Sequence, residues 1–175
     1  MKIVLRVAAV FAAAFLAACG GSGGGSASSG GGSGGGTPPP SGTPEIAVAD
    51  AFPSLSFSQP TALKQAPGDA SRWFVAEKAG VIRVFANNPS SSSSSVFLDI
   101  SAVTAGFGEG GLLGFAFHPD FPVTPEVYVS YTRAGLVSYL SRFSSTDAGQ
   151  TLNPATEDVV LTVIQPATNH NGGDV

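Results

Sequence analysis

The chain has 175 residues, of which 43% are hydrophobic and 11% charged, with 23 Gly, 13 Pro and a single Cys. This length allows one or two domains. One Cys excludes a disulfide framework within the chain and any zinc or iron–sulfur site built from several cysteines, and two His are too few for an all-His metal site. Eight basic against twelve acidic residues give a net charge of −4. Because the basic residues are scattered, no nucleic-acid partner is expected.

The N-terminus has the features of a bacterial secretion signal. Lys2 and Arg6 precede an uninterrupted apolar run from Val7 to Ala18. As a helix this run would span about 18 Å, well short of the ~30 Å hydrocarbon core of a bilayer. We therefore predict that residues 1–18 form a signal peptide and not a membrane span.

The signal ends in Leu16-Ala17-Ala18-Cys19-Gly20, which resembles the lipobox of bacterial lipoproteins. By this resemblance Cys19 carries a diacylglycerol, and several acyl chains on one residue are enough for stable membrane anchoring. Because residue 20 is not Asp, transfer to the outer membrane is compatible with the sequence, and we expect a lipid-anchored protein of the bacterial cell envelope. The alternative is an ordinary signal peptide followed by an incidental Cys.

A linker is predicted to follow the lipidated residue, over residues 19–44. Residues 20–44 are almost wholly Gly, Ser, Thr and Pro. Such a segment has no apolar side chains to bury and cannot offset its ordering entropy, so we expect disorder. Its r.m.s. reach of about 25–30 Å would hold a folded domain away from a membrane surface.

Residues 45–175 are predicted to form an all-β domain. Long stretches with helical periodicity are missing, and short β-rich runs alternate with Gly, Pro, Asn and Ser. The turn Glu77-Lys78-Ala79-Gly80 predicts a tight hairpin in which Gly80 adopts a positive φ. The expected strands are Ala62–Gln65, Arg72–Ala76, Val81–Phe85, Val96–Ile100, Leu112–Phe117, Val127–Thr132, Val137–Phe143 and Asp158–Ile164.

These eight strands fall into two groups of four, which is typical of β-propeller blades. A β-sandwich would also give short strands at this spacing, so the pattern leaves that alternative open. At ~40–50 residues per blade the domain corresponds to about two blades, whereas a closed propeller needs at least four. We therefore expect this chain to be the N-terminal part of a longer protein, poorly stable and inactive in isolation.

The segment from Gly108 to Phe121 resembles the glucose/sorbosone dehydrogenase family, which contains soluble sugar dehydrogenases dependent on pyrroloquinoline quinone (PQQ). Further similarities lie at Arg72–Ile82, Val127–Tyr131 and Asn169–Gly173, in the order expected for the family. The resemblance implies a six-bladed β-propeller. It also implies that the cofactor, a trianionic ortho-quinone, accepts a hydride from C1 of an aldose while a neutral His accepts the proton of the C1 hydroxyl.

The resemblance assigns the base to His170, and imidazole suits this role because its ordinary pKa lies near neutral pH. Asn169 is implied to orient that imidazole or contact the cofactor, and Glu109 to contact cofactor and substrate. From residue type alone, His170 and Asn169 could equally be turn residues and Glu109 a solvated side chain. If Glu109 faces the anionic quinone, its charge requires a basic neighbour or a raised pKa.

Other candidates are interpreted as structural. His118-Pro119-Asp120 is predicted to form a turn, closed by the Asp120 side chain, and not a metal site. Trp73 is predicted to belong to the core of a blade. In the family, the calcium ligands and the basic residues that hold the quinone carboxylates lie further along the chain, so no metal ligand is assigned here.

The combined prediction is a membrane-anchored, PQQ-dependent aldose dehydrogenase that also requires Ca²⁺ and an external electron acceptor. Two alternatives remain from the residues themselves. One is a non-catalytic β-propeller that binds a carbohydrate or a protein partner, and the other is a structural envelope lipoprotein.

Overall fold

The computed structural model describes residues 47–175, and Asp50–Val175 lie in one compact unit. The predicted signal peptide, Cys19 and the linker up to residue 44 lie outside the described residues. Among residues 47–175, no helix is long and apolar enough to cross a membrane.

The described part of the chain contains eight β-strands, close to the predicted ones. The largest difference is in the last strand, which begins five residues before the predicted Asp158. Pro154 signals a strand end, but this strand lies at the edge of its sheet, where a missing N–H costs little. The strands are β1 (Pro60–Lys64), β2 (Arg72–Glu77), β3 (Val81–Ala86), β4 (Ser95–Asp99), β5 (Leu112–Phe117), β6 (Glu126–Arg133), β7 (Val137–Ser144) and β8 (Asn153–Ile164).

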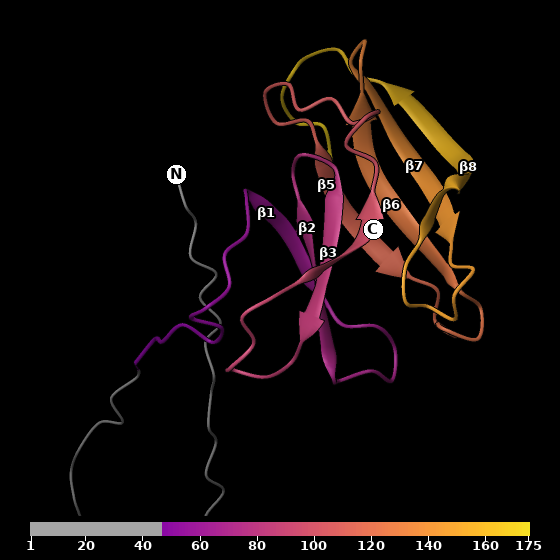
Figure 1. Ribbon diagram of the computed structural model, residues 1–175. Coiled ribbons are helices and arrows are strands. Elements are labelled where there is room, and N and C mark those ends of the chain that lie inside the picture. Colours follow the sequence, from indigo (N-terminus) through magenta and orange to yellow (C-terminus); the bar gives the residue numbers. More distant parts are fainter. Residues whose placement is uncertain (1–46) are drawn as a thin grey trace, which may run out of the picture. The chain divides into compact units, whose positions relative to one another are not determined.

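The strands form two four-stranded antiparallel sheets, β1-β2-β3-β4 and β5-β6-β7-β8, each in simple chain order (Figure 1). Chain-order sheets of four strands are the arrangement of propeller blades, whereas an immunoglobulin-type sandwich draws its two sheets alternately from the chain. The propeller prediction is therefore confirmed for these two blades. The β2–β3 hairpin is also as predicted, with Gly80 at φ 105° and its N–H donating to the Glu77 carbonyl at 3.0 Å.

An aromatic core joins the two sheets. Phe74 and Phe97 of the first sheet have ring centroids 4.7 Å apart, and Phe117 of the second sheet lies 4.8 Å from Phe74. Phe115 and Phe143 belong to the same core and are fully buried. Each such side chain contributes about 1.5–3 kcal/mol by leaving water, so the core holds the two blades face to face.

The first strands of the two blades lie next to each other. The Thr61 hydroxyl of β1 donates to the Leu112 carbonyl of β5 at 2.9 Å. This contact fixes the relative position of the blades near the β2–β3 hairpin and the β4–β5 loop. Those segments later contribute to the candidate site.

The outer face of the first sheet has a smaller apolar cluster. Phe57, Val75 and Phe85 are buried, and Trp73 packs against them. Trp73 therefore belongs to the packing of the blade, as predicted. Beside this cluster, the buried Glu77 carboxylate pairs with Arg83 at 2.8 Å.

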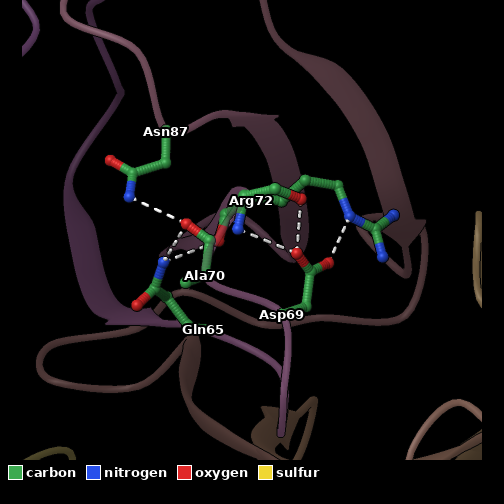
Figure 2. Close-up of polar contacts among 6 residues, drawn as sticks. Gln65, Asp69, Ala70, Arg72 and Asn87 are labelled. Atoms are coloured by element: carbon green, nitrogen blue, oxygen red, sulfur yellow. Dashed lines mark hydrogen bonds and ion pairs between the residues drawn. The ribbon is translucent and has the colours of Figure 1, made fainter.

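The β1–β2 turn is held by a polar network around Asp69 (Figure 2). One carboxylate oxygen of Asp69 accepts the Ser71 N–H at 2.9 Å, and the other accepts Arg72 Nε at 2.7 Å. Gln65 and Asn87 both donate to the Ala70 carbonyl, at 3.1 and 2.9 Å. Burial by itself would raise the pKa of Asp69. The hydrogen bonds from Ser71 and Arg72 outweigh burial and hold that pKa below its ordinary value.

A second polar network crosses the second sheet. Glu157 of β8 accepts hydrogen bonds from the Tyr131 hydroxyl, from Ser141 Oγ at 2.8 Å and from Arg133 Nη2 at 2.7 Å. The Arg133 guanidinium also lies over the Tyr139 ring, 4.4 Å from its centroid. Burial, together with the bond to the carboxylate, raises the pKa of Tyr131 to about 12.

Candidate functional site

The glycine-rich loop before β5 is anchored from inside the second sheet by Thr132. The Thr132 side chain is fully buried, and its hydroxyl accepts the Gly111 N–H at 2.7 Å and donates to the Ala105 carbonyl at 2.6 Å. A Cβ at Gly110 would lie 2.7 Å from that hydroxyl. The loop can approach Thr132 this closely only because residue 110 has no side chain.

The same loop packs against the β2–β3 hairpin of the first sheet. The Lys78 ammonium donates to the Gly108 carbonyl at 2.7 Å, and the Lys78 carbonyl accepts the Leu112 N–H at 2.9 Å. Gly111 has a φ of +140°, and a Cβ there would lie 2.5 Å from the Lys78 carbonyl oxygen. Here the glycines allow two segments of the protein to meet, and the space that their side chains would occupy is filled by the protein itself.

The segment after β8 returns across the second sheet to β5. At its start, the Gln165 N–H donates to the Leu136 carbonyl at 2.7 Å. Near its end, the Gly173 carbonyl oxygen lies against Gly114, where it occupies the place that a Cβ would take. The segment containing Asn169 and His170 is therefore held at both ends.

The structure brings two of the predicted site residues into direct contact. Glu109 Oε2 accepts the backbone N–H of His170 at 2.6 Å, and the Glu109 N–H donates to the Thr168 carbonyl at 2.9 Å. His170 adopts a left-handed conformation with φ 58°. Asn169 lies between Thr168 and His170 and is exposed.

The side chains at this contact keep free polar groups. Within residues 47–175, neither the His170 imidazole nor the Asn169 amide makes a hydrogen bond, and Glu109 Oε1 likewise has no partner. All three residues are exposed. An imidazole, an amide and a carboxylate oxygen on these two adjoining loops are thus available to hydrogen-bond a polar ligand.

Charge at this site is unevenly distributed. Among the basic side chains of the described chain, Lys78 is the one without a carboxylate within ion-pair distance, since each of the others has such a partner. Lys78 binds the carbonyl of Gly108, the residue before Glu109. A basic side chain with no carboxylate partner among the described residues is therefore present next to the loop that carries Glu109.

Two residues of the site carry roles that sequence reasoning did not assign. Thr132 interrupts the alternation of burial in β6, because it is buried directly after the buried Tyr131. Its pairing with Ser138 is regular, so it lies on the opposite face of the sheet from Tyr131, and there the glycine-rich loop covers it. Asn171 is 5% exposed, and its Oδ1 has no hydrogen-bond partner although Nδ2 donates to the Ala167 carbonyl at 3.1 Å. Asn171 lines a cavity of about 350 Å³ together with His170, Ser130 and other residues of the second sheet.

His118 lies in a turn, as predicted, but closes it differently. His118 Nδ1 accepts the Asp120 N–H at 3.1 Å, so the imidazole caps the turn in place of the Asp120 carboxylate. The backbone supplies a second closure, since the Phe121 N–H donates to the His118 carbonyl at 2.9 Å. Within the described part of the chain, no group of three or more His, Cys, Asp or Glu side chains could hold a metal ion.

Comparison with known proteins identifies the family. The model for glucose/sorbosone dehydrogenases matches residues 57–175, which is more than half of the chain. The chain belongs to the glucose/sorbosone dehydrogenase family. Both sheets, the glycine-rich loop and the segment with His170 lie within the matched residues.

Individual proteins and structures that are similar to this chain agree with this assignment. Quinoprotein glucose dehydrogenase B of Acinetobacter calcoaceticus is 40% identical over 78 residues, which are 44% of this chain and 16% of that protein. An oxidoreductase (glucose dehydrogenase) structure from Thermus thermophilus is 32% identical, with a TM-score of 0.53 over 67% of this chain and 33% of its own. The PQQ-bound aldose sugar dehydrogenase of Streptomyces coelicolor is 25% identical, with a TM-score of 0.54 over 67% and 34% of the two chains. This chain therefore spans at most about a third of the length of these relatives.

Proposed function

We propose that the intact protein is a PQQ-dependent aldose dehydrogenase that oxidises the C1 hydroxyl of its sugar. Family membership supports the reaction class, and the PQQ-bound relative supports the cofactor. The single observation that carries the proposal is the contact between Glu109 and His170. These two residues are 61 positions apart in the chain, yet a 2.6 Å hydrogen bond joins them at an exposed pair of loops.

His170 is proposed as the general base. Its imidazole makes no hydrogen bond to other residues in the described part of the chain, so an unprotonated ring nitrogen is free to accept the proton of the C1 hydroxyl. PQQ, when bound, supplies the acceptor for the hydride that leaves C1. Proton transfer to His170 would then leave the substrate two electrons to give up with the hydride, so that its oxidation would balance.

The polar groups at these loops fit part of such a cofactor and its sugar. The amide of Asn169 can donate to a carbonyl or a hydroxyl oxygen, and Glu109 Oε1 can accept from a sugar hydroxyl. Lys78 would offset the negative charge that Glu109 brings to the site. Three quinone carboxylates need more cations than Lys78, so we assign their binding, and that of Ca²⁺, to residues other than those described.

The test is turnover of an artificial electron acceptor by the intact protein, supplied with PQQ, Ca²⁺ and a panel of aldoses. His170→Ala should lower turnover by about 10²-fold or more while most quinone affinity remains. The matched control is His118→Asn, whose side-chain oxygen can still cap the turn and which should keep wild-type turnover.

Two results would contradict the proposal. Near-normal turnover in His170→Ala would remove His170 from the mechanism. No turnover with any aldose, together with no quinone binding, would instead favour a non-catalytic propeller that binds a carbohydrate or protein partner.

We further propose that the protein is anchored in the cell envelope through lipidated Cys19, where it passes electrons to an external acceptor. The support is the Leu16–Gly20 motif, after a charged start and a short apolar run. Labelled palmitate should be incorporated into the wild type and not into Cys19→Ser. Label that persists in the variant would exclude Cys19 as the lipidated residue.

A further inference from the structure

We infer that Glu109 is a positioning residue, whose carboxylate holds the backbone of His170 in its left-handed conformation. This inference deepens the proposed function, because it concerns the residue proposed as the base. It assigns to Glu109 a task that is performed before any ligand binds, in addition to the proposed contact with sugar or cofactor.

The backbone of His170 requires such support. A φ of 58° is disfavoured for any residue with a Cβ, even though His tolerates it better than most. Within the described residues, the bond to Glu109 Oε2 is the one hydrogen bond that the His170 N–H makes. A charged acceptor at 2.6 Å forms a stronger bond than a neutral one would.

Glu109 contacts the loop at two points. Its own N–H donates to the Thr168 carbonyl at 2.9 Å, two residues before His170, while its carboxylate accepts the His170 N–H. The two bonds run in opposite directions between the same pair of segments. Together they set both the distance between the loops and the direction of the chain at His170.

The loop segment that carries Glu109 is itself held in place. Lys78 holds the carbonyl of Gly108, and the buried Thr132 hydroxyl holds the N–H of Gly111, so Glu109 lies between two anchored positions. The Glu109 carboxylate thereby connects the exposed loop of His170 to a segment that is anchored on both sheets. Loss of that carboxylate should free His170 without unfolding either blade.

The first test is residue-resolved amide hydrogen exchange on the intact protein without cofactor or sugar. Glu109→Met keeps the length of the side chain and removes the acceptor, whereas Glu109→Gln keeps a neutral acceptor. The His170 amide should exchange about 10-fold faster or more in Glu109→Met, and Glu109→Gln should lie between Glu109→Met and the wild type. Glu126→Met, which removes an acidic side chain from the start of β6, should leave His170 exchange unchanged.

Equal exchange of His170 in the wild type and in Glu109→Met would overturn the inference. Exchange in Glu109→Gln as fast as in Glu109→Met would also overturn it, because an acceptor at this position would then make no difference. These readings need no catalytic activity, so they stand even if the proposed dehydrogenase function fails.

The second test separates positioning from substrate contact by steady-state kinetics with an aldose. A displaced base should lower kcat by about 10-fold or more in Glu109→Met, with partial recovery of kcat in Glu109→Gln, in addition to any rise in KM from the lost contact with the sugar. A rise in KM at unchanged kcat would mean that Glu109 serves only as a sugar ligand, and would overturn the positioning role.

Discussion

The contact between the glycine-rich loop and the loop of His170 can be tested at Gly108. A Cβ at this position would overlap the Thr168 carbonyl oxygen and lie 3.0 Å from Thr168 Cβ. The obstructing oxygen belongs to the backbone and already accepts the Glu109 N–H, so it cannot rotate away. Gly108 also has a φ of +47°, which a side chain disfavours.

Two costs therefore add in Gly108→Ala. The left-handed conformation costs about 1–2 kcal/mol and a steric clash of this kind about 1–3 kcal/mol, giving a loss of roughly 2–5 kcal/mol in the free energy of unfolding. Urea unfolding of the intact protein, followed by far-UV circular dichroism, measures this loss as a shift of the midpoint at constant slope.

Gly106→Ala is the matched control in the same loop. A Cβ at Gly106 would meet no atom within 4 Å. Its effect should lie between neutral and a stabilisation of about 1 kcal/mol, because alanine restricts the unfolded chain. Equal midpoints for Gly108→Ala and Gly106→Ala would refute the close contact between Gly108 and Thr168.

Three further predictions concern the polar groups that support the blades. Thr132→Val should lower the free energy of unfolding by about 1–3 kcal/mol in urea titrations, because it leaves buried loop groups without partners, and Thr132→Ser should recover most of the loss. Between about pH 10 and 12 the wild type should lose roughly 2 kcal/mol, because Tyr131 with its raised pKa stays protonated when folded and ionises when unfolded. Tyr131→Phe should remove this loss, whereas Tyr128→Phe, on the opposite face of β6, should not; identical alkaline profiles of the two variants would contradict the assignment. The lowered pKa of Asp69 gives stability that is complete above about pH 4 and disappears as the pH falls further, so Asp69→Asn should flatten the acid limb of the urea-midpoint profile.

The strands were predictable because their signals are local. Alternating apolar residues in β6, and the Gly80 turn between β2 and β3, specify strands and hairpins within a few residues of the chain. The limits of such reasoning lie at exceptions to periodicity. Thr132 is buried on the half-buried face of its strand, because a loop distant in sequence covers it there. At His118, the imidazole caps the turn in place of the expected Asp120 carboxylate.

The sequence by itself determined which residue types the site contains, through the motifs around Glu109 and His170, and it determined the grouping of the strands into two blades. Only the tertiary structure decided that the Glu109 carboxylate binds the backbone of His170 and that Lys78 and Thr132 support it. The physical reason is that these contacts join segments from different hairpins and sheets. Their geometry follows from how two aromatic faces stack and how antiparallel strands are registered, and neither is encoded in the periodicity of any single segment.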